Sequence, residues 1–154
     1  MTTAEIVARF LATQSPSVEP PEDVAEQWRQ VGRELGVPCP EALLQLATAG
    51  WPVVIPYAGS EVDNSWFELE SPAQARDRHR WNVEHVRTAG MPAVYTEMLP
   101  FANSDGAQLL LDASGAVHGV PFTIYARAGR IAASLEDLLV RVMAQPIDDD
   151  SLEE

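Results

Sequence analysis

Three histidines and one cysteine are the residues of this chain best suited to catalysis or metal binding. His79 and His85 lie six residues apart on one expected helix, which separates them by about 240° around the helix axis. They therefore cannot ligate one metal ion from the same helix face. Cys39 is the only cysteine, so the chain can form neither an internal disulfide nor a Cys-x-x-Cys site.

Sequence motifs for the common catalytic mechanisms are also missing. The chain has no phosphate-binding loop, dinucleotide-binding glycine pattern, Gly-x-Ser-x-Gly elbow or zinc-protease helix. His118 follows a Leu-Asp turn, where a structural histidine is commoner than a catalytic one, although a Ser-His-Asp triad is defined by geometry and stays an alternative. Residues 148–150 are acidic but lack the central glycine and the ligand spacing of a calcium loop. We predict a protein that is not an enzyme, with no catalytic residues, no metal and no cofactor.

The segment 57–70 is the strongest candidate for binding, because it combines acidic and aromatic side chains. Aromatic anchors inside an acidic rim suit an interface for a basic partner. For Trp66 the sequence leaves open an alternative role in the core. The predicted partner-binding residues are Glu61, Asp63, Trp66, Glu68 and Glu70.

One arginine-rich segment, RDRHRW at residues 76–81, runs against the acidic balance of the chain. On a helix, Arg76, Arg80, Glu84 and Arg87 fall on one face. Local ion pairs on an exposed helix explain this pattern, and a basic ridge that orients a partner is the alternative.

Five helices are predicted from apolar periodicity and capping residues. The second carries the clearest apolar stripe, which begins at Val24 and ends at Leu35, just before the stop at Gly36. Ser71 is expected to cap the fourth, with Gln74 completing a capping box. The predicted helices cover about residues 4–13, 22–35, 41–49, 72–87 and 135–144.

Short strands are predicted at residues 51–57, 65–70, 93–99, 108–112, 116–120 and 122–126, and around Ile131. The two prolines within 51–57 suit an edge strand. Tight turns between successive strands predict antiparallel pairing. The order of elements predicts an α+β fold: an antiparallel sheet with N-terminal helices, one mid-chain helix and a C-terminal helix packed on it, all on one face.

Length, composition and charge bound the class of protein. The 154 residues predict a single domain over residues 1–145, followed by an acidic disordered tail at 146–154. The net charge is −13; without the last seven residues, 18 acids against ten arginines still leave −8. Such a body repels nucleic acid and membrane surfaces and attracts basic partners, although solubility explains the acidity equally well. No apolar run reaches the roughly 18 residues of a membrane helix, and the single cysteine suits a cytoplasmic protein.

The segment LPFANSDGAQLLLDASGAVHGV, followed by IAASLEDLLVRV, resembles the SUKH superfamily, which includes yeast cell-wall synthesis regulators and bacterial immunity proteins. The resemblance covers about residues 24–143. Its motif residues are Pro100-Phe101-Ala102, Asp105-Gly106, Leu111-Asp112, Gly115 and Ser134-Leu135-Glu136, with Glu34-Leu35-Gly36, Pro40 and Gly50 in the N-terminal part. The sequence departs from the family pattern at two places: Cys39-Pro40 stands where the family usually has Leu-Pro, and Ala49-Gly50-Trp51 replaces Asn-Gly-Gly.

The resemblance implies binding rather than catalysis, because the matched residues look structural. Bacterial members look like antidotes that bind and block polymorphic toxins, often nucleases. We therefore expect an immunity protein that neutralises a basic toxin domain by direct binding. A regulatory or scaffold protein of the same fold and a small ligand-binding domain are the alternatives, and the oligomeric state is left open.

Overall fold

The computed structural model describes residues 1–144, with residues 63–65 described by their backbone alone. The tail predicted at residues 146–154 lies outside the described residues. The helices are α1 (Thr3–Leu11), α2 (Val24–Leu35), α3 (Glu41–Thr48), α4 (Pro72–Thr88) and α5 (Leu135–Ala144), with two short 3-10 helices, η1 (Ala93–Glu97) and η2 (Tyr125–Arg127). The strands are β1 (Val54–Gly59), β2 (Asp63–Leu69), β3 (Leu99–Asn103), β4 (Ala107–Leu111), β5 (Val117–Pro121) and β6 (Gly129–Ala132).

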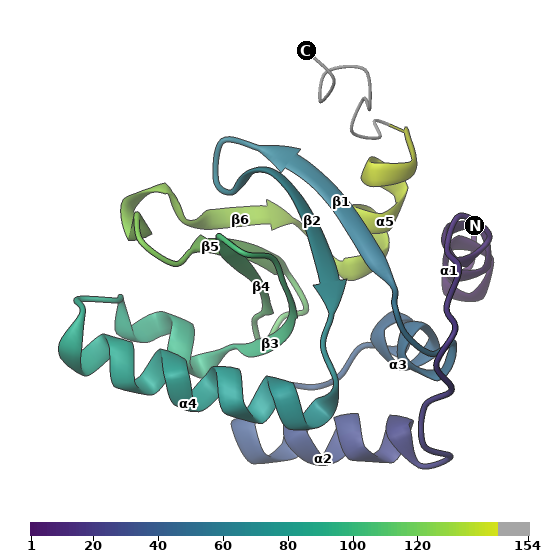
Figure 1. Cartoon of the computed structure of the whole chain (residues 1–154), viewed down its shortest axis with the longest axis horizontal. Helices are drawn as coiled ribbons and strands as arrows, with labels where there is room; N and C mark the ends of the chain where they lie inside the picture. Colours follow the sequence, from purple (N-terminus) through teal and green to yellow (C-terminus); the bar gives the residue numbers. More distant parts are fainter. Residues whose placement is uncertain (145–154) are drawn as a thin grey trace.

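The six strands form one curled sheet in the order β1-β2-β3-β4-β5-β6 (Figure 1). Each neighbouring pair is antiparallel, as predicted for strands joined by tight turns, although α4 and η1 connect β2 to β3. The predicted edge position of β1 is confirmed, and its Pro56 has no N–H to leave unpaired at that edge. Together with the helices at the N-terminus, in mid-chain and at the C-terminus, this sheet confirms the α+β fold.

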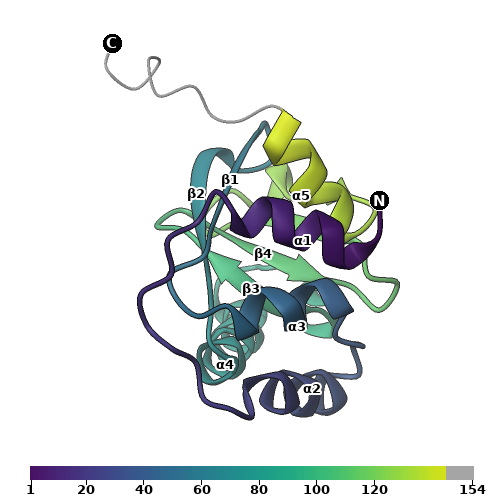
Figure 2. The same ribbon diagram turned by 90° about the vertical axis from the view of Figure 1, so that its right-hand side faces the viewer.

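The main core lies between one face of the sheet and the helices α1, α3 and α5, which gather in front of the strands in Figure 2. Apolar residues of β2 and β4, such as Phe67 and Leu109, point into this core and are fully buried. The predicted stripe of α2 is confirmed, with Trp28 at its buried centre, and Gly36 ends that helix in the left-handed conformation at φ 73°.

The second face of the sheet is covered in part by α4, so the expectation that all helices share one face was wrong (Figure 1). Directly opposed residues of neighbouring strands share a face, and the row Glu68, Asn103, Gln108, Val120 defines this second face. Asn82 of α4 reaches Gln108 through a reciprocal pair of amide hydrogen bonds of 3.0 and 2.7 Å. A separate apolar cluster around Leu110 and Val120 packs beside this pair. The sequence pattern missed it, because α4 is the most polar helix.

Two predicted strands are replaced by 3-10 helices. Residues 93–97 form η1, in which the Thr96 hydroxyl donates to the Ala93 carbonyl at 2.7 Å, and the strand begins only at Leu99. Residues 122–126 bend away from β5 into η2, and Phe122 packs against the Trp81 ring and the Arg78 guanidinium of α4. In both places a tertiary contact with α4 or its cluster overrides the local apolar pattern.

Candidate functional site

The part of the second face that α4 leaves uncovered forms a groove. Alternate residues of a strand point to the same face, so Trp66, Glu68 and the following Glu70 line it from β2. A hollow of about 650 Å³ lies at Trp66 and Glu68. A smaller one of about 250 Å³ lies at Glu70, and both share Arg78 and Asn103. We call the two hollows together the second-face groove.

Trp66 is 46% exposed, so it is a surface residue of the groove rather than a core residue. Its neighbours Phe67 and Val62 are buried in the main core. The half-exposed indole offers an apolar contact surface next to Glu68, which is also exposed. An exposed aromatic ring beside a carboxylate is typical of a binding surface.

Glu70 is the most unusual ionisable residue of the groove, because it is only 2% exposed. Burial raises the pKa of Glu70 to about 7, against the opposing pull of Arg78, whose Nε lies 3.7 Å from Oε1. Its other oxygen, Oε2, is buried and has no hydrogen-bond partner within the described residues. Such an unsatisfied buried acceptor is rare in native proteins and commonly marks a functional position.

Arg78 is held at the junction of the two hollows by aromatic rings. Its guanidinium carbon lies 5.3 Å from the ring centre of Trp81 and 4.8 Å from that of Phe122, distances typical of cation–π contacts. The two rings meet edge to face at 5.2 Å, and Trp81 also stacks on His85. The Nε of Arg78 is buried and lacks a hydrogen-bond acceptor in the described part of the chain. The groove therefore holds the guanidinium of Arg78 next to the carboxyl group of Glu70, and each keeps a hydrogen-bonding atom that the other does not pair.

The predicted residues divide into two groups. Trp66, Glu68 and Glu70 converge on the groove. Glu61 stands apart at the turn between β1 and β2, where its carboxylate accepts a 3.4 Å hydrogen bond from the Tyr57 hydroxyl. Asp63 belongs to β2, but its side chain is outside the described part of the structure.

Arg78, Trp81, Asn103, Asp105 and Phe122 also line the groove and were not predicted. A signal existed for two of them, because Arg78 and Trp81 lie three residues apart on α4 and so share a helix face. Arg80 and Arg87 form the local ion pairs that the simpler interpretation predicted, whereas Arg76 pairs with Glu34 of α2. Those pairs are Arg76 with Glu34 at 2.8 Å, Arg80 with Asp77 at 2.8 Å and Arg87 with Glu84 at 3.1 Å.

His118, Asp112 and Ser114 come closest to a catalytic arrangement, but their hydrogen bonds run in the wrong order for a triad. His118 Nε2 lies 2.8 Å from Asp112 Oδ2, while the Ser114 hydroxyl donates to Asp112 Oδ1 rather than to the imidazole. Burial alone would raise the pKa of Asp112, but hydrogen bonds from Ser114 and His118 and from the Ser114 and Ala116 backbone lower it to about 2. This carboxylate organises the turn between β4 and β5.

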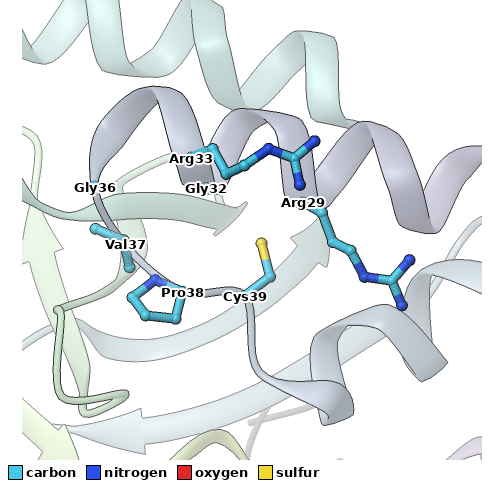
Figure 3. Close-up of a pocket in the computed structure, with 7 residues that line it drawn as sticks. All are labelled: Arg29, Gly32, Arg33, Gly36, Val37, Pro38 and Cys39. Atoms are coloured by element: carbon cyan, nitrogen blue, oxygen red, sulfur yellow. The ribbon is translucent and has the colours of Figure 1, made fainter.

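A shallow hollow of about 370 Å³ lies between α2 and the segment that follows it (Figure 3). Cys39 points its thiol toward α2 there and donates to the Trp28 carbonyl, with 3.0 Å between Sγ and the oxygen. Burial raises the pKa of this thiol to about 11, which suppresses the reactive thiolate. Arg33, which lines the same hollow, is paired with Glu26 at 2.7 Å. These contacts favour a structural role for Cys39.

Within residues 1–144 as described, no three His, Cys, Asp or Glu side chains are grouped so that they can hold a metal ion. None of the helices in that part of the chain has the length and apolar character needed to cross a membrane. No protein-family model matches this chain, and neither a curated protein nor a solved structure matches it. Membership of the SUKH superfamily therefore stays a prediction.

Proposed function

We propose that this protein is a non-catalytic binding domain that takes a basic segment of a partner protein into the second-face groove. The observation that carries the proposal is the convergence of Trp66, Glu68 and the unsatisfied Glu70 on one hollowed surface. An incoming cation can pair with the exposed carboxylate of Glu68, while the indole of Trp66 provides an apolar contact.

The charge of the whole chain supports a basic partner. A net charge of −13 attracts cationic surfaces at a distance and accelerates their association. The same charge disfavours nucleic acid and anionic membranes as partners. The finer proposal, which rests on the SUKH resemblance, is a cytoplasmic immunity protein that blocks a basic toxin, such as a nuclease, by direct binding.

The test is co-expression of the chain with each protein encoded beside its gene, followed by measurement of growth rescue and of binding by the purified pair. Glu68→Lys combined with Asp105→Lys should weaken binding strongly, because both carboxylates line the groove. Glu19→Lys combined with Glu22→Lys changes the net charge equally on exposed residues that do not line the groove, and is the matched control. Equal loss in both variants would show that only overall charge matters. Absence of any bound or neutralised neighbour would end the toxin proposal.

A small-ligand site is the second candidate function, and the enclosed position of Glu70 beside Arg78 favours it. A small molecule that carries both an amine and an acid can satisfy this carboxylate and this guanidinium together. A ligand that binds only the folded state raises the melting temperature. A thermal-shift screen of zwitterionic metabolites tests this candidate, and a shift that disappears in Glu70→Gln would support it.

A further inference from the structure

The inner edge of β2 is only partly used by the sheet. Toward β1, β2 pairs at every position from Glu68 to Asp63. Toward β3 it pairs at two positions, Glu68 with Asn103 and Leu69 with Ala102. In the described part of the chain, most of the length of β2 thus has a strand on one side only.

The backbone of Trp66 faces the unused side. Leu69 N donates to the Val53 carbonyl on the β1 side at 2.9 Å, and Glu70 N donates to the Phe101 carbonyl on the β3 side at 2.8 Å. Backbone groups alternate sides along a strand, so Trp66, like Glu68 and Glu70, directs its N–H and C=O toward β3. Among the residues that the structure describes, no strand lies opposite Trp66, because β3 ends at Asn103 and the chain turns back into β4.

The larger hollow of the groove occupies this gap. Trp66 and Glu68 of β2 form one wall, and the turn at residues 103–106 together with Phe122 forms the other. This hollow, of about 650 Å³, lies between the free edge of β2 and the turn that follows β3. An edge with unpaired N–H and C=O groups next to an open space is a template for an added strand.

We infer that the partner segment binds as an extended strand along the free inner edge of β2 at Trp66, with basic side chains at every second position. This inference rests on the proposed function and specifies how the groove performs it. Alternate side chains of an added strand point to the second face, where they meet Glu68 and Asp105. Main-chain hydrogen bonds then supply affinity that does not depend on partner sequence, and the carboxylates select for positive charge.

The length of the segment follows from the free edge. The five residues from Asp63 to Phe67 extend about 17 Å at roughly 3.3 Å per residue. A partner strand of about five residues covers this distance, and about two or three of its side chains face the groove.

The first experiment uses a synthetic peptide, acetyl-TRVRVRT-amide, and nitrogen-15-labelled full-length protein. Binding is followed by NMR titration, and hydrogen exchange of the Trp66 amide is measured with and without peptide. We expect that amide to become protected, because it acquires a backbone acceptor. Two control peptides are the TEVEVET analogue, which should not bind, and a TRVRVRT analogue N-methylated at alternate residues, which should bind at least tenfold more weakly.

The second experiment isolates the backbone donor by comparing Trp66→Pro with Trp66→Val. Both variants lose the indole, and only proline also removes the N–H that faces the gap. The pairing with β1 does not use that N–H, and the residue opposite on β1, Pro56, has none either. Both variants should therefore fold, which circular dichroism checks, and Trp66→Pro should bind the peptide about two- to tenfold more weakly than Trp66→Val.

The outcomes separate this inference from the proposed function. Peptide binding that leaves the Trp66 amide unprotected, or equal affinities of the two variants, would overturn strand addition and leave charge-based docking in the groove intact. A second outcome would also overturn strand addition and leave charge-based docking intact. In it the peptide does not bind, but Glu68→Lys with Asp105→Lys still abolishes binding of a neighbouring gene's product. Failure of the peptide together with insensitivity to those reversals would overturn both.

Discussion

Replacement of Glu70 by glutamine should remove a pH dependence of stability that the buried carboxylate imposes on the protein. Burial raises the pKa of Glu70 from 4.5 to about 7, so the folded state holds this proton more tightly than the unfolded state does. The stability that Glu70 contributes by holding its proton more tightly in the folded state is fully present below pH 4.5. It is lost as the pH rises toward and through 7. The charged groups that line the same hollow are Asp77 and Arg78 of α4, and Arg78 opposes the shift.

The expected magnitude follows from the two pKa values of Glu70. A difference of 2.5 between 4.5 and about 7 corresponds to about 3 kcal/mol of unfolding free energy, at about 1.4 kcal/mol for each unit. Whole domains are stable by roughly 5–15 kcal/mol, so the loss is large enough to measure. Glutamine is uncharged at every pH, so Glu70→Gln should match the wild type near pH 4.5 and exceed its stability at pH 8.

The assay is urea unfolding followed by tryptophan fluorescence at a series of pH values from 4.5 to 8. Glu68→Gln is the matched control, because it removes one carboxylate from the same strand and face at an exposed position. The control should keep the wild-type slope of stability against pH, whereas Glu70→Gln should have a flatter one. An identical slope in wild type and Glu70→Gln would refute the argument that burial of this carboxylate controls the slope.

Three further outcomes are expected. Asn82→Leu should lower the free energy of unfolding in urea by about 1–3 kcal/mol, because it leaves the buried amide of Gln108 without its hydrogen-bond partner. Adding Gln108→Leu should recover part of that loss, and a double variant that loses the sum of the two single losses would contradict this. The pKa of Asp112 is lowered from 3.8 to about 2, so this carboxylate stabilises the fold above pH 3.8 and loses that contribution as the pH falls toward 2. The melting temperature of Asp112→Asn should therefore drop less between pH 3.8 and 2 than that of the wild type. Partial burial raises the pKa of the Cys39 thiol to about 11, so Cys39 should react with a thiol reagent at pH 8 far more slowly in native than in urea-unfolded protein. Equal rates in the two states would contradict the raised pKa.

Local sequence patterns were sufficient for much of the fold because their causes are local. The stripe of α2 and the capping box at Ser71 need only neighbouring residues, and the structure contains both. The same reasoning failed at residues 93–97 and 122–126. There the chain is β-rich in composition, but contacts with α4 and the second apolar cluster favour 3-10 turns.

The groove shows the same division. By itself the sequence identified Trp66, Glu68 and Glu70 as candidate binding residues and predicted a strand at residues 65–70, in which side chains alternate with a period of two. It also determined the acidic charge that favours a basic partner.

Only the tertiary structure decided that this strand face lies opposite Arg78 of α4 and that Glu70 is buried there. Only the pairing register shows that β3 ends beside Glu68 and leaves the backbone of Trp66 facing an open hollow. Both features depend on how segments far apart in the chain meet, and a residue's neighbours in sequence do not specify such long-range contacts.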